Sequence, residues 1–487
     1  MPKYLDKSLT EINELLKEHK ITPTDLVEEA FANIEEHQDL NCFITLDKEG
    51  ALKRAKELEA KEVSGLTYGI PIVLKDNLVT KDLRTTAASK MLENFIPIYN
   101  ADVVDKVNEA DMIIIGKTNM DEFAMGSSNR TSYFGTVKNP WNSSRVAGGS
   151  SGGSAAAICS RIVPFALGSD TGGSIRQPSS FCGIVGLKPT YGRVSRYGLI
   201  AFASSLDQIG PMTKNVYENA VLLNKICGKS SHDLTSVETN EDFTRLIGKS
   251  IKGMKIAIPK FYVSDAIDPE IKAELNKVIA ALEKEDCQID YVDIKYIDKA
   301  VPLYQIIAMG EASSNLARFD GIRYGYSYEN PANIEDLYLK TRKNGFGDEV
   351  KRRIMIGSYL LSGKNAKTYY NKALQIRDDM RNSFLEVYKN YDLIIGPTNT
   401  TVAYEQDKGL DDAIKSFMDD VLTIPVNMAG LPGMSVPVGF NSEHLPIGLQ
   451  IIGAPFTEAK MYQLASFIEK TVNLDLNPYH TGGKKND

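Results

Sequence analysis

The chain has 487 residues, of which 56 are Lys or Arg and 63 are Asp or Glu, so its formal charge is −7. A chain of this length can bury a large core without help from disulfides or a metal. The acidic balance argues against nucleic-acid binding through a basic face of its own. No stretch approaches 18 apolar residues, and residues 1–7 lack the apolar segment of a secretory signal, so we expect a cytoplasmic protein without membrane contact.

The five cysteines are odd in number and far apart, and none forms a C-x-x-C pair. Such spacing is typical of reduced, buried thiols rather than of a disulfide framework. Cys159 and Cys182 lie near glycine-rich motifs and remain minor candidates for a nucleophile. Zinc sites need ligands at short spacing, so the sequence predicts no metal site.

Helical patterns fill most of the first 64 residues. Ser8 and Glu11 match a capping box ahead of an amphipathic stretch. Beyond residue 65 the pattern changes to short apolar runs, at residues 69–74 and 112–115, separated by a further amphipathic stretch. Helices alternating with short buried strands predict an α/β fold.

Residues 148–192 are dense in Gly and Ser, a composition that would also suit a flexible linker. Apolar runs interrupt the segment at residues 155–158, 162–167 and 184–187, and we interpret them as core strands. Glycines between such runs let the backbone approach another group closely. We therefore expect a packed segment with a function rather than a linker.

The second half begins with a predicted βαβ unit over residues 252–294. Long helical patterns follow at 301–319 and 348–388. We expect the later strands to rejoin the sheet that begins near residue 70, so that residues 1–487 form a single domain. Its predicted parts are N-terminal helices (1–64), a core (65–215), a βαβ and helical insertion (245–390), returning strands with a C-terminal helix (391–475) and a flexible tail (481–487).

Three Gly-Lys-Ser/Thr triplets, at residues 116–118, 228–230 and 248–250, match the end of a phosphate-binding loop. Each lacks the Gly five positions before its last Gly that the P-loop requires. The Gly-rich segment also contains no G-x-G-x-x-G. Nucleotide binding by this chain is therefore poorly supported.

Residues 148–152 formally match the G-x-S-x-G elbow of α/β-hydrolases, with Ser150 as nucleophile. That elbow needs a strand directly before it, whereas residues 139–145 are typical of a loop. It also needs a histidine base, and the downstream histidines lie in polar, turn-like contexts: His232, His444 and His480. The elbow remains a weak rival interpretation.

A lysine with two serines fits the sequence better. Lys75 ends an apolar run, so burial is expected to lower its pKa and make it a base near neutral pH. Ser150 and Ser174 lie in two Gly-rich loops whose small residues can turn several N–H groups toward one point. Alone, Lys75 could be an ion-paired lysine and the serines helix caps. Their joint occurrence favours nucleophilic catalysis without histidine.

These loops resemble the amidase signature family. The similarity rests on residues 148–154 (GGSSGGS) and 170–178 (DTGGSIRQP), and it continues through 186–190 (GLKPT) and 207–211 (DQIGP). It covers nearly the whole chain and is strongest over residues 65–215. The resemblance implies a large mixed β-sheet core flanked by helices on both faces.

Within that family the chain is similar to the A subunits of bacterial tRNA-dependent amidotransferases. The motifs are residues 120–128 (MDEFAMGSS), 311–321 (EASSNLARFDG) and 350–354 (VKRRI). The resemblance implies hydrolysis of glutamine to supply ammonia for converting Glu-tRNA(Gln) to Gln-tRNA(Gln), with Asp-tRNA(Asn) as a possible second substrate. A free-standing amidase acting on another carboxamide and an inactive scaffold are the alternatives.

The same resemblance implies partners and cofactors. B and C subunits would complete a heterotrimer, and charged tRNA would be bound through the B subunit. ATP and Mg would be used by the B subunit, so no cofactor is expected in this chain.

The resemblance also assigns roles to residues. Ser174 would be the nucleophile, Ser150, on a cis peptide after Gly149, the bridging serine, and Lys75 the base. The backbone N–H groups expected to hold the oxyanion are those of Thr171, Gly172, Gly173 and Ser174.

Free glutamine is a zwitterion, so its pocket needs both an anion and a cation site. The resemblance suggests Arg353 for the α-carboxylate, because an Arg fork suits a carboxylate. It suggests Asp420 for the α-ammonium and Tyr304 for the pocket lining. Arg352 or Lys351 could be the pocket cation instead.

Overall fold

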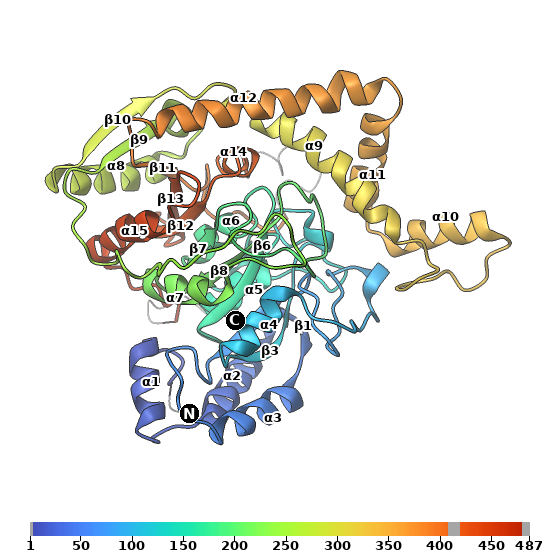
Figure 1. The fold of residues 1–487 in the computed structure, drawn as a ribbon, viewed down its shortest axis with the longest axis horizontal. Coiled ribbons are helices and arrows are strands. Elements are labelled where there is room, and N and C mark those ends of the chain that lie inside the picture. Colours follow the sequence, from blue (N-terminus) through green and yellow to red (C-terminus); the bar gives the residue numbers. More distant parts are fainter. Residues whose placement is uncertain (1–2, 408–418, 480–487) are drawn as a thin grey trace.

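The computed structural model describes residues 3–407 and 419–479, and the predicted tail over residues 481–487 lies outside them. Eleven strands form one sheet that runs through the molecule (Figure 1), in the order β1-β3-β2-β6-β8-β7-β12-β13-β11-β9-β10. The strands are β1 (Phe43–Leu46), β2 (Pro71–Lys75), β3 (Ile113–Thr118), β6 (Phe165–Asp170), β7 (Val185–Lys188), β8 (Gln208–Thr213), β9 (Lys255–Pro259), β10 (Gln288–Val292), β11 (Leu393–Pro397), β12 (Gly433–Phe440) and β13 (Pro446–Gly453); β4 (Lys138–Asn139) and β5 (Asn142–Val146) form a separate hairpin.

The sheet is mixed. β2 pairs in parallel with β3 and β6, and β9 pairs in parallel with β10 and β11. Antiparallel pairs connect these two parts, through β8, β7, β12 and β13. The returning strands thus rejoin the first half of the sheet, as predicted, with Met434 of β12 opposite Leu187 of β7.

Helices cover the sheet. α5 and α6 pack against each other and against its central strands, while α7 and α15 form a second packed pair. Every residue of β2, β6, β7 and β8 is buried, as expected for strands covered on both faces. The helices are α1 (Leu9–Lys17), α2 (Pro23–Glu36), α3 (Lys48–Glu59), α4 (Asp102–Glu109), α5 (Gly152–Cys159), α6 (Arg176–Cys182), α7 (Val216–Ile226), α8 (Pro269–Lys284), α9 (Ala300–Asn315), α10 (Ile334–Gly345), α11 (Asp348–Leu361), α12 (Asn371–Val387), α14 (Ile424–Met428) and α15 (Glu458–Val472).

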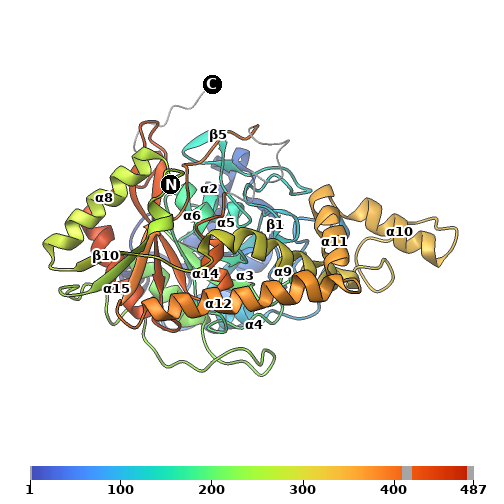
Figure 2. The ribbon, with the colours of Figure 1, turned by 90° about the horizontal axis from the view of Figure 1, so that it is seen from above.

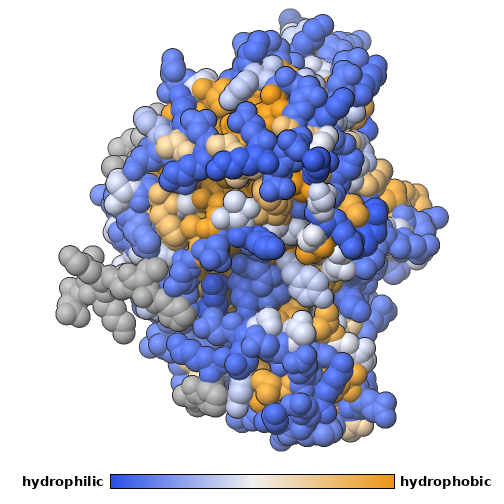
Figure 3. Space-filling view, turned by 90° about the vertical axis from the view of Figure 1, so that its left-hand side faces the viewer, coloured by the Kyte–Doolittle hydropathy of each residue, from blue (hydrophilic) through white to orange (hydrophobic). Residues whose placement is uncertain are grey.

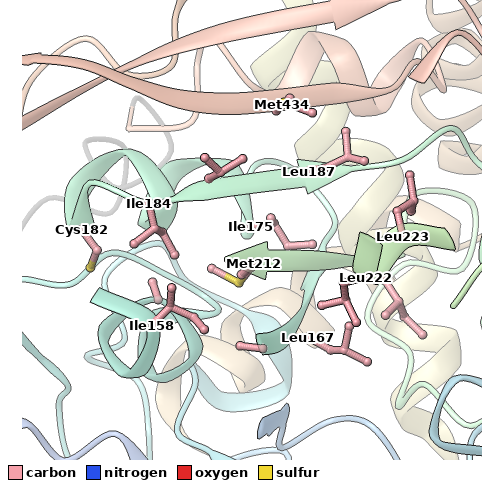
Figure 4. Close-up of a cluster of buried hydrophobic side chains, with 14 of the residues drawn as sticks. Ile158, Leu167, Ile175, Cys182, Ile184, Leu187, Met212, Leu222, Leu223 and Met434 are labelled. Atoms are coloured by element: carbon pink, nitrogen blue, oxygen red, sulfur yellow. The ribbon is translucent and has the colours of Figure 1, made fainter. Parts of the chain in front are cut away.

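The core around the Gly-rich segment is apolar and continuous. Figure 4 shows side chains from α5, β6, α6, β7, β8, α7 and β12 meeting in one cluster. Ile175 belongs to this cluster and is fully buried. Because Ile175 directly follows Ser174, the core fixes one end of the loop that carries this serine.

The capping box predicted at the first helix is confirmed. Ser8 Oγ accepts the N–H of Glu11 at 3.3 Å, and a Glu11 carboxylate oxygen accepts the N–H of Ser8 at 2.9 Å.

Two predictions of local structure were wrong. Residues 155–158 lie within helix α5 rather than in a strand; three of them are alanine, the strongest helix former, and a short apolar run does not by itself distinguish a strand from a helix. The helical pattern over residues 348–388 is two helices, α11 and α12. The chain turns between them at Gly363, whose φ of +47° glycine adopts at little cost.

Helices α9 to α12 form an arm beside the sheet. α10 projects away from the body, whereas α12 runs back along it (Figures 1 and 2). On the side where α8 and α15 lie, apolar residues occur in patches among hydrophilic side chains (Figure 3). Within residues 3–407 and 419–479, no helix is both long and apolar enough to cross a membrane.

Candidate active site

Lys75 is the last residue of β2 and is fully buried. Its Nζ donates hydrogen bonds to Ser150 Oγ (2.7 Å), Ser151 Oγ (2.9 Å) and the carbonyl oxygen of Ser169 (3.2 Å). Burial lowers the pKa of Lys75 to about 7, although nearby carboxylates favour its charged form. Near neutral pH a large fraction of this lysine is therefore uncharged.

Ser150 is held against Lys75 by a loop with little free space. The Gly149–Ser150 peptide is cis, as expected. The N–H of Gly149 donates to Gln177 Oε1 at 2.9 Å, and the carbonyl of Ser150 accepts the N–H of Asp121 at 3.3 Å. A Cβ added to Gly149 would lie 2.0 Å from Asp121 Oδ2, so no larger residue fits there.

Ser174 lies in the loop between β6 and α6 and is buried. Its carbonyl oxygen accepts the N–H of Ser151 at 3.2 Å, so the two Gly-rich loops meet side by side. The loop is fixed on its other side by Thr423 Oγ1, which donates to the carbonyl of Gly172 at 2.7 Å. The structure therefore brings both loops and Lys75 together.

Tyr304 and Asp420 reach the same loop from different segments, and Arg353 lies beside Tyr304. A Cβ added to Gly172 would lie 3.0 Å from Tyr304 Cζ, and one added to Gly173 would lie 2.8 Å from Asp420 Oδ1. Arg353 is buried beside Tyr304, and both Tyr304 and Asp420 favour its charged form. Tyr304 and Asp420 are thus neighbours of the Ser174 loop, and Arg353 lies next to Tyr304.

Arg353 differs from the other candidate cations. Its Nε donates to Glu349 at 2.7 Å, and its guanidinium lies 5.4 Å from the ring centre of Phe202. Arg352 and Lys351 are more exposed and pair with acidic residues one turn back on α11. Of the three, Arg353 alone is buried toward the site.

A fully buried ion pair supports this loop. Both side chains, Asp170 and Arg176, have no exposed surface, and Arg176 Nη2 lies 3.0 Å from Asp170 Oδ1. Burial would raise the pKa of Asp170, but the Arg176 guanidinium lowers it to about 2. The pair therefore has a structural role.

We expect Arg176→Met to lower the free energy of unfolding by about 3–5 kcal/mol, because it leaves a buried carboxylate without its partner. The pKa of Asp170 is lower in the folded protein than its ordinary value of 3.8. The ion pair therefore contributes its full stabilisation of the folded state above pH 3.8. This stabilisation is lost as the pH falls toward 2. Urea unfolding near pH 7 and near pH 3 measures both effects. Equal stability of variant and wild type at pH 7 would contradict this assignment.

Comparisons with known proteins identify the family of the chain. The profile of the family described as Amidase matches residues 25–461. The chain belongs to the amidase family. The A subunit of the glutamyl-tRNA(Gln) amidotransferase from Pediococcus pentosaceus is 52% identical over 96% of this amidase and 97% of its own length. The corresponding protein from Listeria innocua is 53% identical, with the same shares covered.

Solved structures agree too. The A subunit of the glutamyl-tRNA(Gln) amidotransferase from Thermotoga maritima is 40% identical, with a TM-score of 0.80 over 96% of this chain and 95% of that one. A bacterial aryl acylamidase of the amidase signature family superposes with a TM-score of 0.84 at 23% identity, which shows the shared fold. The predicted α/β fold with a large mixed sheet is thus confirmed.

The histidine-based alternative has no support in this amidase. Ser150 contacts Lys75, whereas His232 Nδ1 lies 2.8 Å from Asp102 and His444 stacks on Phe440. His480 lies outside the described residues.

The cysteine alternative fails as well, because burial raises the pKa of Cys159 to about 12 and that of Cys182 well above its usual value. Thiols of this kind are poor nucleophiles near neutral pH. Among the described residues, no cluster of three or more His, Cys, Asp or Glu side chains could hold a metal ion.

Several supporting residues of this amidase were missed. Ser151 Oγ lies 2.9 Å from Lys75 Nζ, nearly as close as Ser150 Oγ at 2.7 Å, and only its place beside Ser150 could have indicated this. Asp121 and Gln177 were part of the recognised motifs, but their contacts with Gly149 join segments far apart in the chain. Asp207 was also missed, although it lies in a recognised motif.

Proposed function

We propose that this amidase is the glutaminase subunit of a tRNA-dependent amidotransferase. The main observation in support of amide hydrolysis is the position of Lys75. It is buried, its pKa is lowered to about 7, and its Nζ lies 2.7 Å from Ser150 Oγ. The substrate class rests on relatives about 50% identical over nearly the whole chain, all described as A subunits of glutamyl-tRNA(Gln) amidotransferases.

The proposed mechanism uses Lys75 as base, Ser150 as relay and Ser174 as nucleophile. Neutral Lys75 takes a proton from Ser150 as Ser150 takes one from Ser174, and Ser174 attacks the side-chain amide carbon of glutamine. The proton returns along the same path to the leaving nitrogen, and ammonia departs. Water then attacks the γ-glutamyl ester and releases glutamate.

The oxyanion formed in each attack needs donors fixed in advance. We assign this role to the backbone N–H groups of Thr171, Gly172, Gly173 and Ser174. The contacts of this loop with Thr423 and Ser151 hold it in place before substrate arrives.

The pocket residues suit the two charges of free glutamine. Asp420 Oδ1 is buried without a hydrogen-bond partner among the described residues, and burial raises the pKa of its carboxyl. An α-ammonium placed there would satisfy that oxygen and favour the ionised carboxylate. Arg353 would bind the α-carboxylate, with Tyr304 forming the wall between them.

We expect Arg353→Met to raise KM for glutamine about 10- to 100-fold, because a charged hydrogen-bonding partner of the carboxylate is lost. Arg352→Met, on the exposed face of the same helix, is the matched control and should leave KM unchanged. Steady-state ammonia release measures both. If Arg352→Met raised KM and Arg353→Met did not, the cation of the pocket would be Arg352.

We propose B and C subunits as partners in a heterotrimer and the cytoplasm as the location. The acidic balance of this chain fits a division of labour in which charged tRNA is bound through the B subunit. ATP and Mg would be used by the B subunit to activate the aminoacyl ester. No cofactor is proposed for the chain itself.

The test is ammonia release from glutamine by the purified chain, alone and with B and C subunits, Glu-tRNA(Gln) and ATP. We expect glutamine hydrolysis that the complete complex couples to formation of Gln-tRNA(Gln). Efficient cleavage of simple aliphatic or aryl amides, with glutamine left intact, would instead establish the free-standing amidase. Asp-tRNA(Asn) in place of Glu-tRNA(Gln) tests the second substrate.

A further inference from the structure

Asp207 is a buried carboxylate directly before β8, outside the proposed proton path. Its Oδ1 accepts the hydroxyl of Thr171 at 2.6 Å. Its Oδ2 accepts the N–H groups of Phe202 at 2.9 Å and Ala203 at 3.0 Å. A buried carboxylate is destabilising unless its hydrogen bonds are all made. Asp207 therefore fixes the positions of these three donors.

The first of these contacts reaches the oxyanion loop. Thr171 is the first residue after β6, where the chain leaves the sheet and enters the Gly172–Gly173 turn. Two glycines give that turn little stiffness of its own, and Gly173 has a φ of +149°. The side chain of Thr171 is thus one anchor at the strand end of the loop, while Thr423 holds the next residue.

The second group of contacts reaches the substrate pocket. Phe202, whose N–H is held by Asp207, lies edge-on to Tyr304 with ring centres 6.4 Å apart. The guanidinium of Arg353 lies over the ring of Phe202. One carboxylate therefore connects the loop of the nucleophile with the wall of the pocket.

We propose that Asp207 is a positioning residue that, through the Thr171 hydroxyl, aims the backbone N–H groups of the loop at the developing oxyanion. This inference rests on the proposed function, because it takes Ser174 as the nucleophile. Donors of an oxyanion hole act mainly in the transition state, so their displacement lowers kcat more than it raises KM. A purely structural Asp207 would instead change stability and leave the kinetics of the folded protein intact.

The experiment compares Thr171→Val, Thr171→Ser and Asp207→Asn in the full chain with its partner subunits. Thr171→Val keeps the shape and the backbone N–H of Thr171 but loses its hydroxyl. Thr171→Ser keeps the hydroxyl and loses only the methyl group. Thr213→Val removes a buried hydroxyl at the far end of β8 and is the matched control. Two readouts are taken: kcat and KM for glutamine, and the rate at which a fluorophosphonate probe labels Ser174.

We expect Thr171→Val to lower kcat about 10- to 100-fold with KM changed less than about 2-fold, and to slow labelling similarly. Thr171→Ser should stay close to wild type, as should Thr213→Val. Asp207→Asn can keep a hydrogen bond to Thr171, because its amide N–H can donate to Thr171 Oγ1 while its oxygen accepts the N–H groups of Phe202 and Ala203. Its kcat should therefore lie between that of Thr171→Val and that of the wild type.

The inference is overturned if Thr171→Val keeps wild-type kcat and labelling rate, if Thr171→Ser falls as far as Thr171→Val, or if the loss lies in KM alone. Labelling separates this test from the proposed function. A wild-type protein labelled at Ser174 that does not hydrolyse glutamine would refute the substrate, while the variants would still be compared by labelling. A wild type that is not labelled at Ser174 would refute the nucleophile and this inference together.

Discussion

Replacing Lys75 with Arg is expected to lower kcat for glutamine hydrolysis by about 10³-fold or more. Arginine stays protonated at any pH at which the protein is folded, so it cannot accept the proton from Ser150. The variant keeps a long cationic side chain at the end of β2, so the loss tests proton acceptance rather than charge. Ammonia release measures it, with circular dichroism as the control for folding.

The pH profile of the wild type tests the same lysine without a substitution. Burial lowers the pKa of Lys75 to about 7, and the neutral form is the base. The value of kcat/KM should therefore rise with pH and level off above pH 7, with an apparent pKa near that value. A profile that is flat from about pH 5 to 9 would mean that Lys75 does not act as the base.

Ser174→Ala is expected to reduce ammonia release by about 10⁴-fold or more, because no acyl-enzyme can form without the hydroxyl. The matched comparison is Ser150→Ala with Ser151→Ala. Both hydroxyls lie within hydrogen-bond distance of Lys75 Nζ, at 2.7 and 2.9 Å.

If Ser150 is the relay, Ser150→Ala should approach the loss seen for Ser174→Ala, whereas Ser151→Ala should retain most of the activity. The reverse order of losses would assign the relay to Ser151. Full activity of Ser174→Ala would show that another residue is the nucleophile.

Much of the fold could be predicted from the sequence because many of its strands contain short apolar runs bounded by turn residues. The βαβ unit illustrates this: β9, α8 and β10 occur where the apolar pattern placed them. Residues 155–158 were misassigned because an alanine-rich apolar run carries no periodicity of its own. The turn at Gly363 was missed because the helical pattern of the sequence continues on both sides of it.

Part of the candidate site could also be predicted from the sequence, and part could not. Lys75 could be selected from the sequence because it ends an apolar run, and Ser150 and Ser174 because they lie in Gly-rich motifs. The structure brings their segments together. The contact of Asp207 with Thr171 joins residues 36 positions apart, and nothing in the sequence specifies that pairing. Such hydrogen bonds are set by the order of strands in the sheet, where β8 lies beside β6.

The scarcity of histidine also has a physical account. None of the five histidines falls within the proposed catalytic motifs. A lysine whose pKa is brought to about 7 by burial supplies the base that a histidine would otherwise provide.

The most direct test of the proposed mechanism is to trap the acyl-enzyme. The protein with its partner subunits is mixed with glutamine, quenched in acid during turnover, digested and examined by mass spectrometry. We predict a γ-glutamyl ester on the peptide that contains Ser174, absent from Lys75→Arg and Ser174→Ala. A γ-glutamyl adduct on any other residue, or ammonia release without an adduct on Ser174 under conditions that trap esters, would contradict it.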